Sequence, residues 1–416
     1  MKSNIITSID LGSSVTRCVI ADISQESEQI RIMGVGIAES RGMRRGAVID
    51  IDDAADSISE AVEKAEQMSG EKIRDAIVSI GGAGITVKDT QGVIAIGRAD
   101  GTVNDDDVIR VIEAAQAVSI PANNEIIHII PRSFSVDDQR DIKEPVGLQG
   151  IRLEVDTVIV EAPSNHVKNL TEAMERADVA IIDSIIEPLA AAESTLTKKQ
   201  KELGVVLVNM GASTTSIAVY EEGELFHTAV LPVGSDFITN DIAIGLRTDI
   251  EIAEKIKFEY GSANMQGVDK KDLIDLSHID ENEVEPVYHY HILEIIQARL
   301  EEIFELVVKE LESIGKDQLL PAGAVLTGGG AHMPHVVEFA KERLRLPVTI
   351  GQPNNLLGVV DHVDDSSYAT IIGLILWELQ SNQAQNGFGG SSFAGIGSGA
   401  GEMTDKIKDI FGRFLP

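Results

Sequence analysis

Two segments of the sequence place glycine and hydroxyl side chains between apolar runs, a pattern suited to binding phosphate. The first, Asp10-Leu11-Gly12-Ser13-Ser14, lies between apolar residues 5–9 and 15–21 and predicts a strand, a tight turn and a second strand. We expect Gly12 to turn the backbone at positive φ. The N–H groups of residues 12–14 would then converge on an anion, with hydroxyl donors from Ser13 and Ser14. Asp10 would orient a water bound to Mg²⁺. Arg17 has two interpretations: it reaches a phosphate, or it points to solvent from the second strand.

A related segment occurs about 200 residues later. After Asn209, the residues Gly211, Ala212, Ser213 and Thr214 again separate two strand-like runs. A third turn, Gly328-Gly329-Gly330, follows apolar residues 324–327 and precedes a helical pattern, where the backbone can approach a ligand closely. One such turn is weak evidence, because an ordinary hairpin explains it. Three turns in this order predict one phosphate site between two related subdomains.

Apolar periodicity predicts the elements that position these turns. Helices are expected at residues 52–67, 168–176, 188–196, 238–246, 250–260, 287–313, 334–344 and 368–379. Strands are expected at residues 76–80, 125–130, 154–161, 180–186 and 324–327. Residues 86–96 alternate around Gln91-Gly92, which predicts a hairpin, and Asn104 can cap a helix that begins with three aspartates. The mixture predicts a compact α+β insertion at about residues 83–162.

The composition limits the classes of function. A formal charge of −32 disfavours nucleic-acid binding, because the chain repels phosphate backbones and no basic patch offsets that charge. Cys18 is the only cysteine and lies in an apolar run, which favours a buried thiol in a reducing compartment. The early glycine turn leaves no room for a signal peptide, and no run of about 20 apolar residues occurs, so we expect a cytoplasmic body. The pairs His289/His291 and His332/His335 lack the framework of a metal site and are expected on the surface or in packing.

The C-terminal residues differ from the rest of the chain. Residues 380–401 hold seven glycines, four serines and no charged side chain, which indicates a flexible linker. Helical spacing follows, with three basic and two acidic side chains (net +1) opposite an apolar face. That face consists of Met403, Ile407, Ile410, Phe411 and Phe414, with Leu415 at its edge. A helix packed on its own domain is the alternative, but a docked helix does not need such a linker. We therefore expect an amphipathic helix that binds membrane lipids reversibly.

The three turns resemble those of the actin/Hsp70/sugar-kinase superfamily, in which two phosphate loops and an adenosine turn have this order. The segment that begins Glu187-Pro188 is similar to a connecting segment of the Hsp70 and bacterial actin branches. This resemblance implies that Glu187 polarises the attacking water; a carboxylate that stabilises a helix N-terminus is the alternative. Glu254 and Lys257 match the helix that contacts adenosine, with a solvated i,i+3 pair as the alternative.

One residue departs from the superfamily pattern. The second phosphate loop usually carries Asp where this chain has Asn209. A neutral amide can hydrogen-bond a Mg²⁺-bound water but adds no negative charge. We therefore expect ATP to be bound firmly and hydrolysed slowly, if at all.

Within that superfamily the whole chain most resembles the FtsA family of bacterial cell-division proteins. The resemblance implies an α/β fold with actin-like, ribonuclease-H-type duplicated domains and an inserted α+β subdomain. The implied boundaries are 1–82, 163–200 and 358–380 for subdomain 1A, 83–162 for the inserted subdomain 1C, 201–232 and 306–357 for subdomain 2A, 233–305 for subdomain 2B, 381–402 for the linker, and 403–416 for the membrane helix.

The resemblance also implies a function. The chain would bind ATP with Mg²⁺, with weak or no ATPase activity, and polymerise with its own copies on the cytoplasmic face of the membrane at the division site. Subdomain 2B would bind the C-terminal peptide of the tubulin-like protein FtsZ, and subdomain 1C would contact later division proteins. One alternative is an actin-like pilus-assembly protein, which the terminal helix disfavours. Another is a small-molecule kinase, for which we see no dedicated catalytic carboxylate. An Hsp70-type chaperone would need a peptide-binding domain after residue 380.

Overall fold

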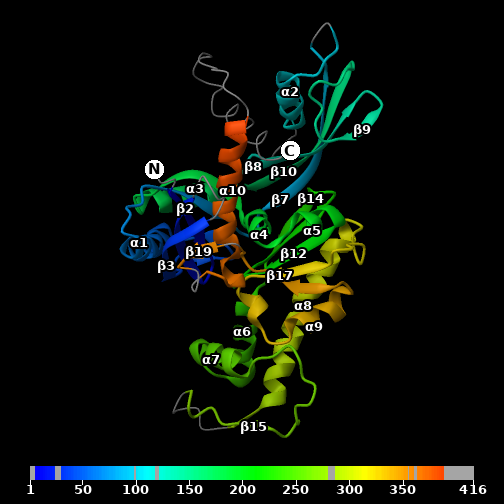
Figure 1. Cartoon of the computed structure of the whole chain (residues 1–416). Coiled ribbons are helices and arrows are strands. Elements are labelled where there is room, and N and C mark those ends of the chain that lie inside the picture. Colours follow the sequence, from blue (N-terminus) through cyan, green and yellow to red (C-terminus); the bar gives the residue numbers. More distant parts are fainter. Residues whose placement is uncertain are drawn as a thin grey trace.

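Two sheets with matching strand order form the centre of the protein (Figure 1). The computed structural model describes residues 5–23, 30–97, 100–117, 121–279, 286–354, 356–359 and 363–387, with residues 381–387 given by their backbone only. The first sheet has the order β11-β6-β1-β2-β3-β19 and the second has the order β14-β13-β12-β17-β18. In both, three consecutive antiparallel strands are followed by two parallel strands. The predicted duplicated α/β architecture is therefore confirmed.

Apolar runs form the central strands because helices cover the sheets. The first sheet contains β1 (Ile5–Leu11), β2 (Val15–Ile23), β3 (Ile30–Glu39), β6 (Asp75–Ile80), β11 (Ala180–Ile186) and β19 (Leu356–Gly358). The second contains β12 (Val205–Met210), β13 (Thr215–Glu221), β14 (Glu224–Leu231), β17 (Ala324–Thr327) and β18 (Val348–Ile350). All of β12, and all of β1 except its first residue, are buried, as expected for strands covered on both faces.

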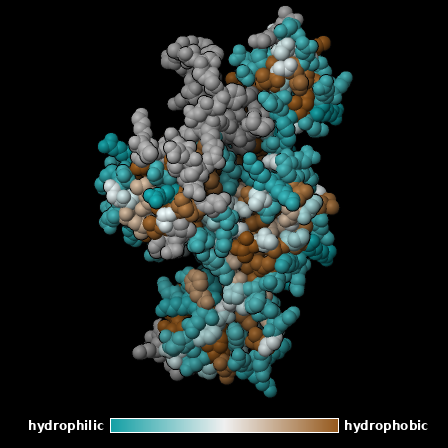
Figure 2. Space-filling model, viewed as in Figure 1, coloured by the Kyte–Doolittle hydropathy of each residue, from teal (hydrophilic) through white to brown (hydrophobic). Residues whose placement is uncertain are grey.

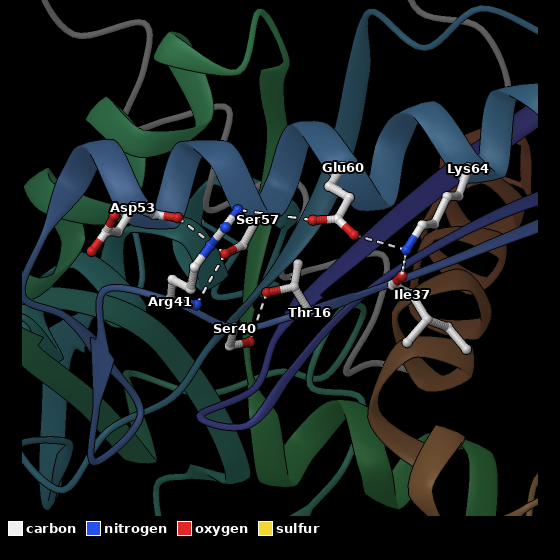
Figure 3. Close-up of polar contacts among 8 residues, drawn as sticks. All are labelled: Thr16, Ile37, Ser40, Arg41, Asp53, Ser57, Glu60 and Lys64. Carbon is white, nitrogen blue, oxygen red and sulfur yellow. Dashed lines mark hydrogen bonds and ion pairs between the residues drawn. The ribbon is translucent and has the colours of Figure 1, made fainter.

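Helix α1 (Ile51–Ser69) packs on β2 and β3 of the first sheet, and polar side chains join it to the end of β3 (Figure 3). Asp50 caps its N-terminus. The backbone N–H of Arg41 donates to Ser57 Oγ on the helix at 2.9 Å, and the hydroxyls of Thr16 and Ser40 lie 2.8 Å apart. These contacts fix β2 and the end of β3 close to the first turn.

The remaining elements of the two halves are short strands and connecting helices. In the first half these are β4 (Met43–Arg44), β5 (Ala47–Val48), α3 (Ser164–Arg176) and α4 (Glu187–Thr195), and α5 (Lys198–Leu203) follows and packs on β13 of the second half. In the second half they are α6 (Ser235–Leu246), α7 (Ile250–Tyr260), β15 (Leu273–Ile274), β16 (Val287–Tyr288), α8 (His289–Ser313), the 3-10 helix η1 (Gly329–His332) and α9 (Val336–Leu344). The 3-10 helix η3 (Ser366–Tyr368) leads into α10 (Ala369–Gly387), which packs on the first half. The bounds of α7 are those predicted from the sequence. Helices α6, α7 and the start of α8 form the lower part of Figure 1.

An inserted subdomain lies at the top of Figure 1 and has its own hydrophobic core. Its described residues form the antiparallel sheet β7-β10-β8-β9 and the helix α2. Its elements are β7 (Thr86–Ala95), α2 (Asp105–Ala115), β8 (Asn124–Val136), β9 (Gln139–Ile142) and β10 (Arg152–Pro163). The predicted cap of α2 is confirmed, since Asn104 and Asp107 form reciprocal side-chain-to-backbone bonds.

The hairpin predicted at residues 86–96 is wrong. These residues form one continuous strand, β7, which pairs with β10 from Thr86 to Ala95. A Cβ at Gly92 would lie 2.1 Å from the carbonyl oxygen of Val111 in α2. The glycine therefore allows a helix to pack closely on the strand and does not mark a turn.

Helix α10 (Ala369–Gly387) continues beyond its predicted end at residue 379, so the linker does not begin at residue 381. The stretch 380–387 contains a single glycine, Gly387, together with glutamine and alanine residues that favour a helix. The remaining linker and the predicted membrane helix, 403–416, lie outside the described residues. Within the described ranges, no helix is long and apolar enough to cross a bilayer.

Candidate functional site

A cavity of about 410 Å³ lies between the two halves, where the three glycine turns meet. The predicted site residues that line it are Asp10, Gly12, Ser13, Ser14, Arg17, Glu187, Asn209, Gly211, Ala212, Thr214, Glu254, Lys257, Gly328, Gly329 and Gly330. Ser213 does not line the cavity, but its hydroxyl donates to Ser13 Oγ at 2.5 Å. The two hairpin turns are therefore joined directly by their serine side chains.

Glycine is needed in the first turn, but not for the predicted reason. Gly12 does not have positive φ, so that expectation is wrong. Glycine is required there because a Cβ would lie 2.7 Å from the carbonyl oxygen of Val15, which the pairing of β1 with β2 brings close. The backbone N–H of Gly46, between β4 and β5, donates to Ser13 Oγ at 3.0 Å. Ser13 thus connects the turn to a neighbouring hairpin as well as to the second half.

The second turn is closed by its own backbone. The N–H of Gly211 donates to the carbonyl of Thr214 at 2.9 Å. The first N–H groups of α6, from Ser235 and Asp236, donate to the carbonyls of Gly211 and Ala212 at 2.9 and 2.8 Å. The N–H of Gly211 is thus used within the turn, and an anion would have to be bound by the groups that follow it.

The third turn packs on the second. Gly328 has a φ of 81°, which favours glycine, and a Cβ there would lie 2.3 Å from Asn209 Oδ1. At Gly329, by contrast, an added Cβ would meet no atom within 4 Å. Gly328 is therefore required for close packing, whereas Gly329 faces open space at the cavity.

Glu187, the first residue of α4, faces the second half of the protein. Asn209 Nδ2 donates to Glu187 Oε1 at 2.6 Å, and the Ser216 hydroxyl donates to the same oxygen at 3.4 Å. Burial, followed by the negative charge of Asp10, raises the pKa of the Glu187 carboxyl from 4.5 to about 8. Because such a carboxyl is largely protonated at neutral pH, it is a poor base until a nearby cation lowers its pKa.

Asp10 and Arg17, on β1 and β2, also line the cavity. Burial raises the pKa of Asp10, although the hydroxyl of Ser79 donates to Asp10 Oδ1 at 2.6 Å and Arg17 contributes positive charge. Arg17 does not point to solvent: its guanidinium carbon lies 4.9 Å from the centre of the Tyr368 ring, and Nε is buried. Asp236 also lines the cavity, and burial raises the pKa of its carboxyl, so three carboxyls with raised pKa values face one space that would suit a bound cation. No cluster of three metal-ligating side chains occurs among the described residues.

Lys257 is not a solvated member of an i,i+3 pair. Its ammonium donates to Thr239 Oγ1 at 2.7 Å and lies 3.9 Å from the carboxylate of Glu254. Burial lowers the pKa of Lys257, while Glu254 and then Asp236 partly offset this effect. The half-exposed Glu254 and the buried Lys257 both line the cavity.

Several lining residues were not assigned from the sequence. These are Leu11, Val15, Gly46, Ser79, Gly81, Met210, Ser235, Asp236, Ile238, Phe258, His332, Met333, Pro334, Ser367 and Thr370. His332 follows Gly330 by two positions, and this proximity is a signal that could have placed it at the site. Its Nε2 lies 3.0 Å from Ser366 Oγ. Ser79 could not have been found in this way, because its partner Asp10 is 69 residues away in the sequence.

The raised pKa of Glu187 predicts a pH-dependent stability. The folded protein binds the Glu187 proton more tightly than the unfolded chain does. The contribution of this proton to the free energy of unfolding is therefore complete below pH 4.5 and is lost as the pH rises toward 8. Glu187→Gln is therefore expected to raise the melting temperature at pH 8.5 and to have little effect at pH 4.5. Thermal melts of both proteins across this pH range test this, and a shift of equal size at every pH would contradict it.

Comparisons with known proteins identify the family. The sequence model for "Cell division protein FtsA" matches residues 206–373, and that for "SHS2 domain inserted in FTSA" matches residues 82–161. The cell division protein FtsA of Pseudomonas aeruginosa is 36% identical over 94% of this chain and 93% of its own length. FtsA of Bacillus subtilis is 37% identical over 92% of this chain and 85% of its own length.

Solved structures show the same architecture at low sequence identity. The PilM-PilN type IV pilus biogenesis complex has a TM-score of 0.65 at 15% identity, covering 89% of this chain and 97% of that one. MreB5 of Spiroplasma citri bound to AMPPNP has a TM-score of 0.55 at 13% identity, covering 93% of this chain and all of that one (100%). These likenesses establish an actin-like fold. Together with the identities to relatives that span nearly the whole chain, they show that this protein belongs to the FtsA family of cell-division proteins.

Proposed function

We propose that this protein binds ATP between its two halves, polymerises on the cytoplasmic face of the membrane at the division site, and anchors FtsZ there. The observation that supports ATP binding best is the meeting of all three glycine turns at one cavity. The turns come from strands far apart in the sequence, yet each presents backbone or hydroxyl groups to the same space. Such groups are suited to phosphate oxygens.

From the chemistry of the lining residues, we propose which part of ATP each side of the cavity would bind. Phosphates would lie against the turns at residues 12–14 and 211–214, near Arg17. Mg²⁺, when bound with ATP, would neutralise phosphate charge, and Asp10 would orient one of its waters. Lys257 and Glu254, close to the exposed ring of Phe258, would contact the nucleoside. Phe258 is 74% exposed, which leaves its ring free to contact a base.

Hydrolysis would be slow for two reasons. Asn209 adds no negative charge near the metal. Glu187, whose pKa is raised to about 8, is largely protonated at neutral pH and accepts a hydrogen bond from Asn209. Both features favour a protein in which ATP holds a conformation and is not rapidly consumed.

The partner surfaces are proposed from the family and from exposed apolar side chains. In the unit formed by α6, α7 and α8, Ile244 is 76% exposed and Ile250 is 54% exposed. By the family resemblance, we assign this unit to the C-terminal peptide of FtsZ, and these exposed apolar side chains are candidates for that contact. Figure 2 shows apolar patches over the inserted subdomain as well as over the central body and the lower unit, and we assign the patch on the inserted subdomain to later division proteins and a neighbouring protomer.

Reconstitution on lipid vesicles tests the anchoring role. FtsZ mixed with anionic liposomes, the intact chain and Mg-ATP is expected to sediment with the vesicles. FtsZ that lacks its C-terminal peptide is the matched control and should stay in the supernatant. If the chain sediments and full-length FtsZ does not, the protein is not an FtsZ anchor. If the chain itself stays in solution, membrane attachment is wrong.

A further inference from the structure

Strand β8 of the inserted subdomain contacts both halves of the protein (Figure 1). His128 lies near its start and contacts the first half, where β11 ends and α4 begins. Arg132, four residues further, contacts the edge strand β14 of the second half. The insertion is thus attached to both sides of the cavity by side chains of a single strand.

His128 makes its contact next to a residue of the candidate site. The backbone N–H of Ile186 donates to His128 Nε2 at 3.1 Å. Ile186 is the last residue of β11, an edge strand of the first sheet, and is also the N-cap residue of α4, which has no side-chain cap. The His128 ring is further held by the Trp377 ring of α10, with 6.0 Å between the ring centres. His128 therefore binds an N–H that the outer edge of β11 would otherwise leave without a strand partner.

The residue after Ile186 is Glu187. Its backbone position is set by the end of β11, and its carboxylate then reaches across the cavity to Asn209. We propose that His128 is a positioning residue for Glu187, through which the inserted subdomain holds the Glu187 carboxylate inside the nucleotide cavity. This role rests on the proposed nucleotide site, whose cavity Glu187 lines.

The contacts of Arg132 explain how the insertion keeps this position. Arg132 Nε donates to the carbonyl of Leu225 at 3.1 Å, and its terminal nitrogen bonds the carbonyl of Phe226. Its guanidinium also lies over the Phe226 ring and forms an ion pair with Asp89 at 2.8 Å. Because Arg132 fixes β8 to the second half, a movement of that half relative to the first would shift β8 and with it the contact of His128 with Ile186.

A double-mutant cycle on the intact chain tests the proposal without any ligand. Glu187→Gln is measured alone and together with His128→Phe, which keeps a ring against Trp377 but removes the acceptor. With His128 present, Glu187→Gln raises the melting temperature more at pH 8.5 than at pH 5.5. The difference between these two increases is the pH-dependent gain. In the His128→Phe background, we expect Glu187→Gln to give roughly half of this gain or less, because the Glu187 carboxylate can then reach solvent. The groups that face Glu187, namely Asp10 on β1, Asn209 on β12 and Ser216 on β13, are unchanged in all variants.

Three further variants separate positioning from a general loss of stability. His128→Gln places an amide oxygen near the position of Nε2 and is expected to restore the full pH-dependent gain. Ser135→Ala, on the same strand, is the matched control and should leave the gain unchanged. His128→Asn, whose amide is one carbon shorter, provides a second variant without the acceptor if His128→Phe does not fold.

The outcomes distinguish this proposal from the proposed function. An equal gain from Glu187→Gln with and without the His128 acceptor would overturn the positioning role, even if every melting temperature fell. Mg-ATP binding is measured on the same proteins. Failure of the wild-type chain to bind ATP would overturn the nucleotide site, whereas ATP binding without the coupling would overturn only the role of His128.

Discussion

Gly329→Leu is expected to lower the affinity for Mg-ATP by on the order of 100-fold or more, an effect of about 2.7 kcal/mol. An added Cβ at this position meets no protein atom within 4 Å, so the fold can accept the side chain. Gly329 lines the cavity, and a leucine side chain would therefore occupy space that the nucleotide needs. Equilibrium binding of a fluorescent ATP analogue, with competition by ATP, measures the change.

Gly329→Ala is the matched control for this prediction. A single methyl group fills little of the cavity, so its effect on affinity should be less than about tenfold, whereas its effect on the backbone is similar to that of leucine. Equal melting temperatures for the two variants would show that the fold tolerates both. Unchanged ATP affinity in a well-folded Gly329→Leu protein would mean that ATP does not bind between the three turns.

The sequence predicted the parts of the site that depend on local pattern. The two related hairpin turns and the glycine-rich turn could be found because each has glycines beside an apolar run, and their repetition indicated a duplicated fold. Helix α7 and the cap at Asn104 were also predicted correctly, since periodicity and capping act within a few residues.

The parts that failed depend on contacts between distant segments. Gly92 was interpreted as part of a turn. Glycine is needed there because the backbone of α2 packs closely against it, and the pattern of a single sequence cannot predict that contact. Gly12 is a similar case: its φ is not positive, and glycine is needed because a Cβ would collide with the carbonyl oxygen of Val15. The raised pKa of Glu187 arises from burial and from the charge of Asp10, a residue that is far from it in the sequence but close to it in the cavity. Sequence pattern thus located the turns, while the tertiary structure determined how each one works.

Removing the residues after Gly387 is expected to abolish sedimentation with anionic liposomes in the presence of Mg-ATP. The cut is placed there because α10 continues to Gly387, so a cut at residue 380 would damage a helix of the body. The body of the protein contributes most of the −32 charge and would be repelled by anionic lipid. The predicted apolar face of residues 403–416 would then supply the attraction, at ~1.5–3 kcal/mol for each large side chain that is fully buried.

A point variant separates the apolar face from the length of the chain. Phe411→Asp with Phe414→Asp keeps the full linker and is expected to reduce vesicle binding as strongly as the truncation, because it removes two aromatic side chains and adds two charges. Lys408→Gln, on the opposite face, should weaken binding only slightly. Binding should also increase steeply with protein concentration, since a polymer that presents many helices gains avidity that one weak helix lacks. If the aspartate variant binds like the wild type, lipid attachment does not use this face, and the membrane role must be reassigned to the folded body.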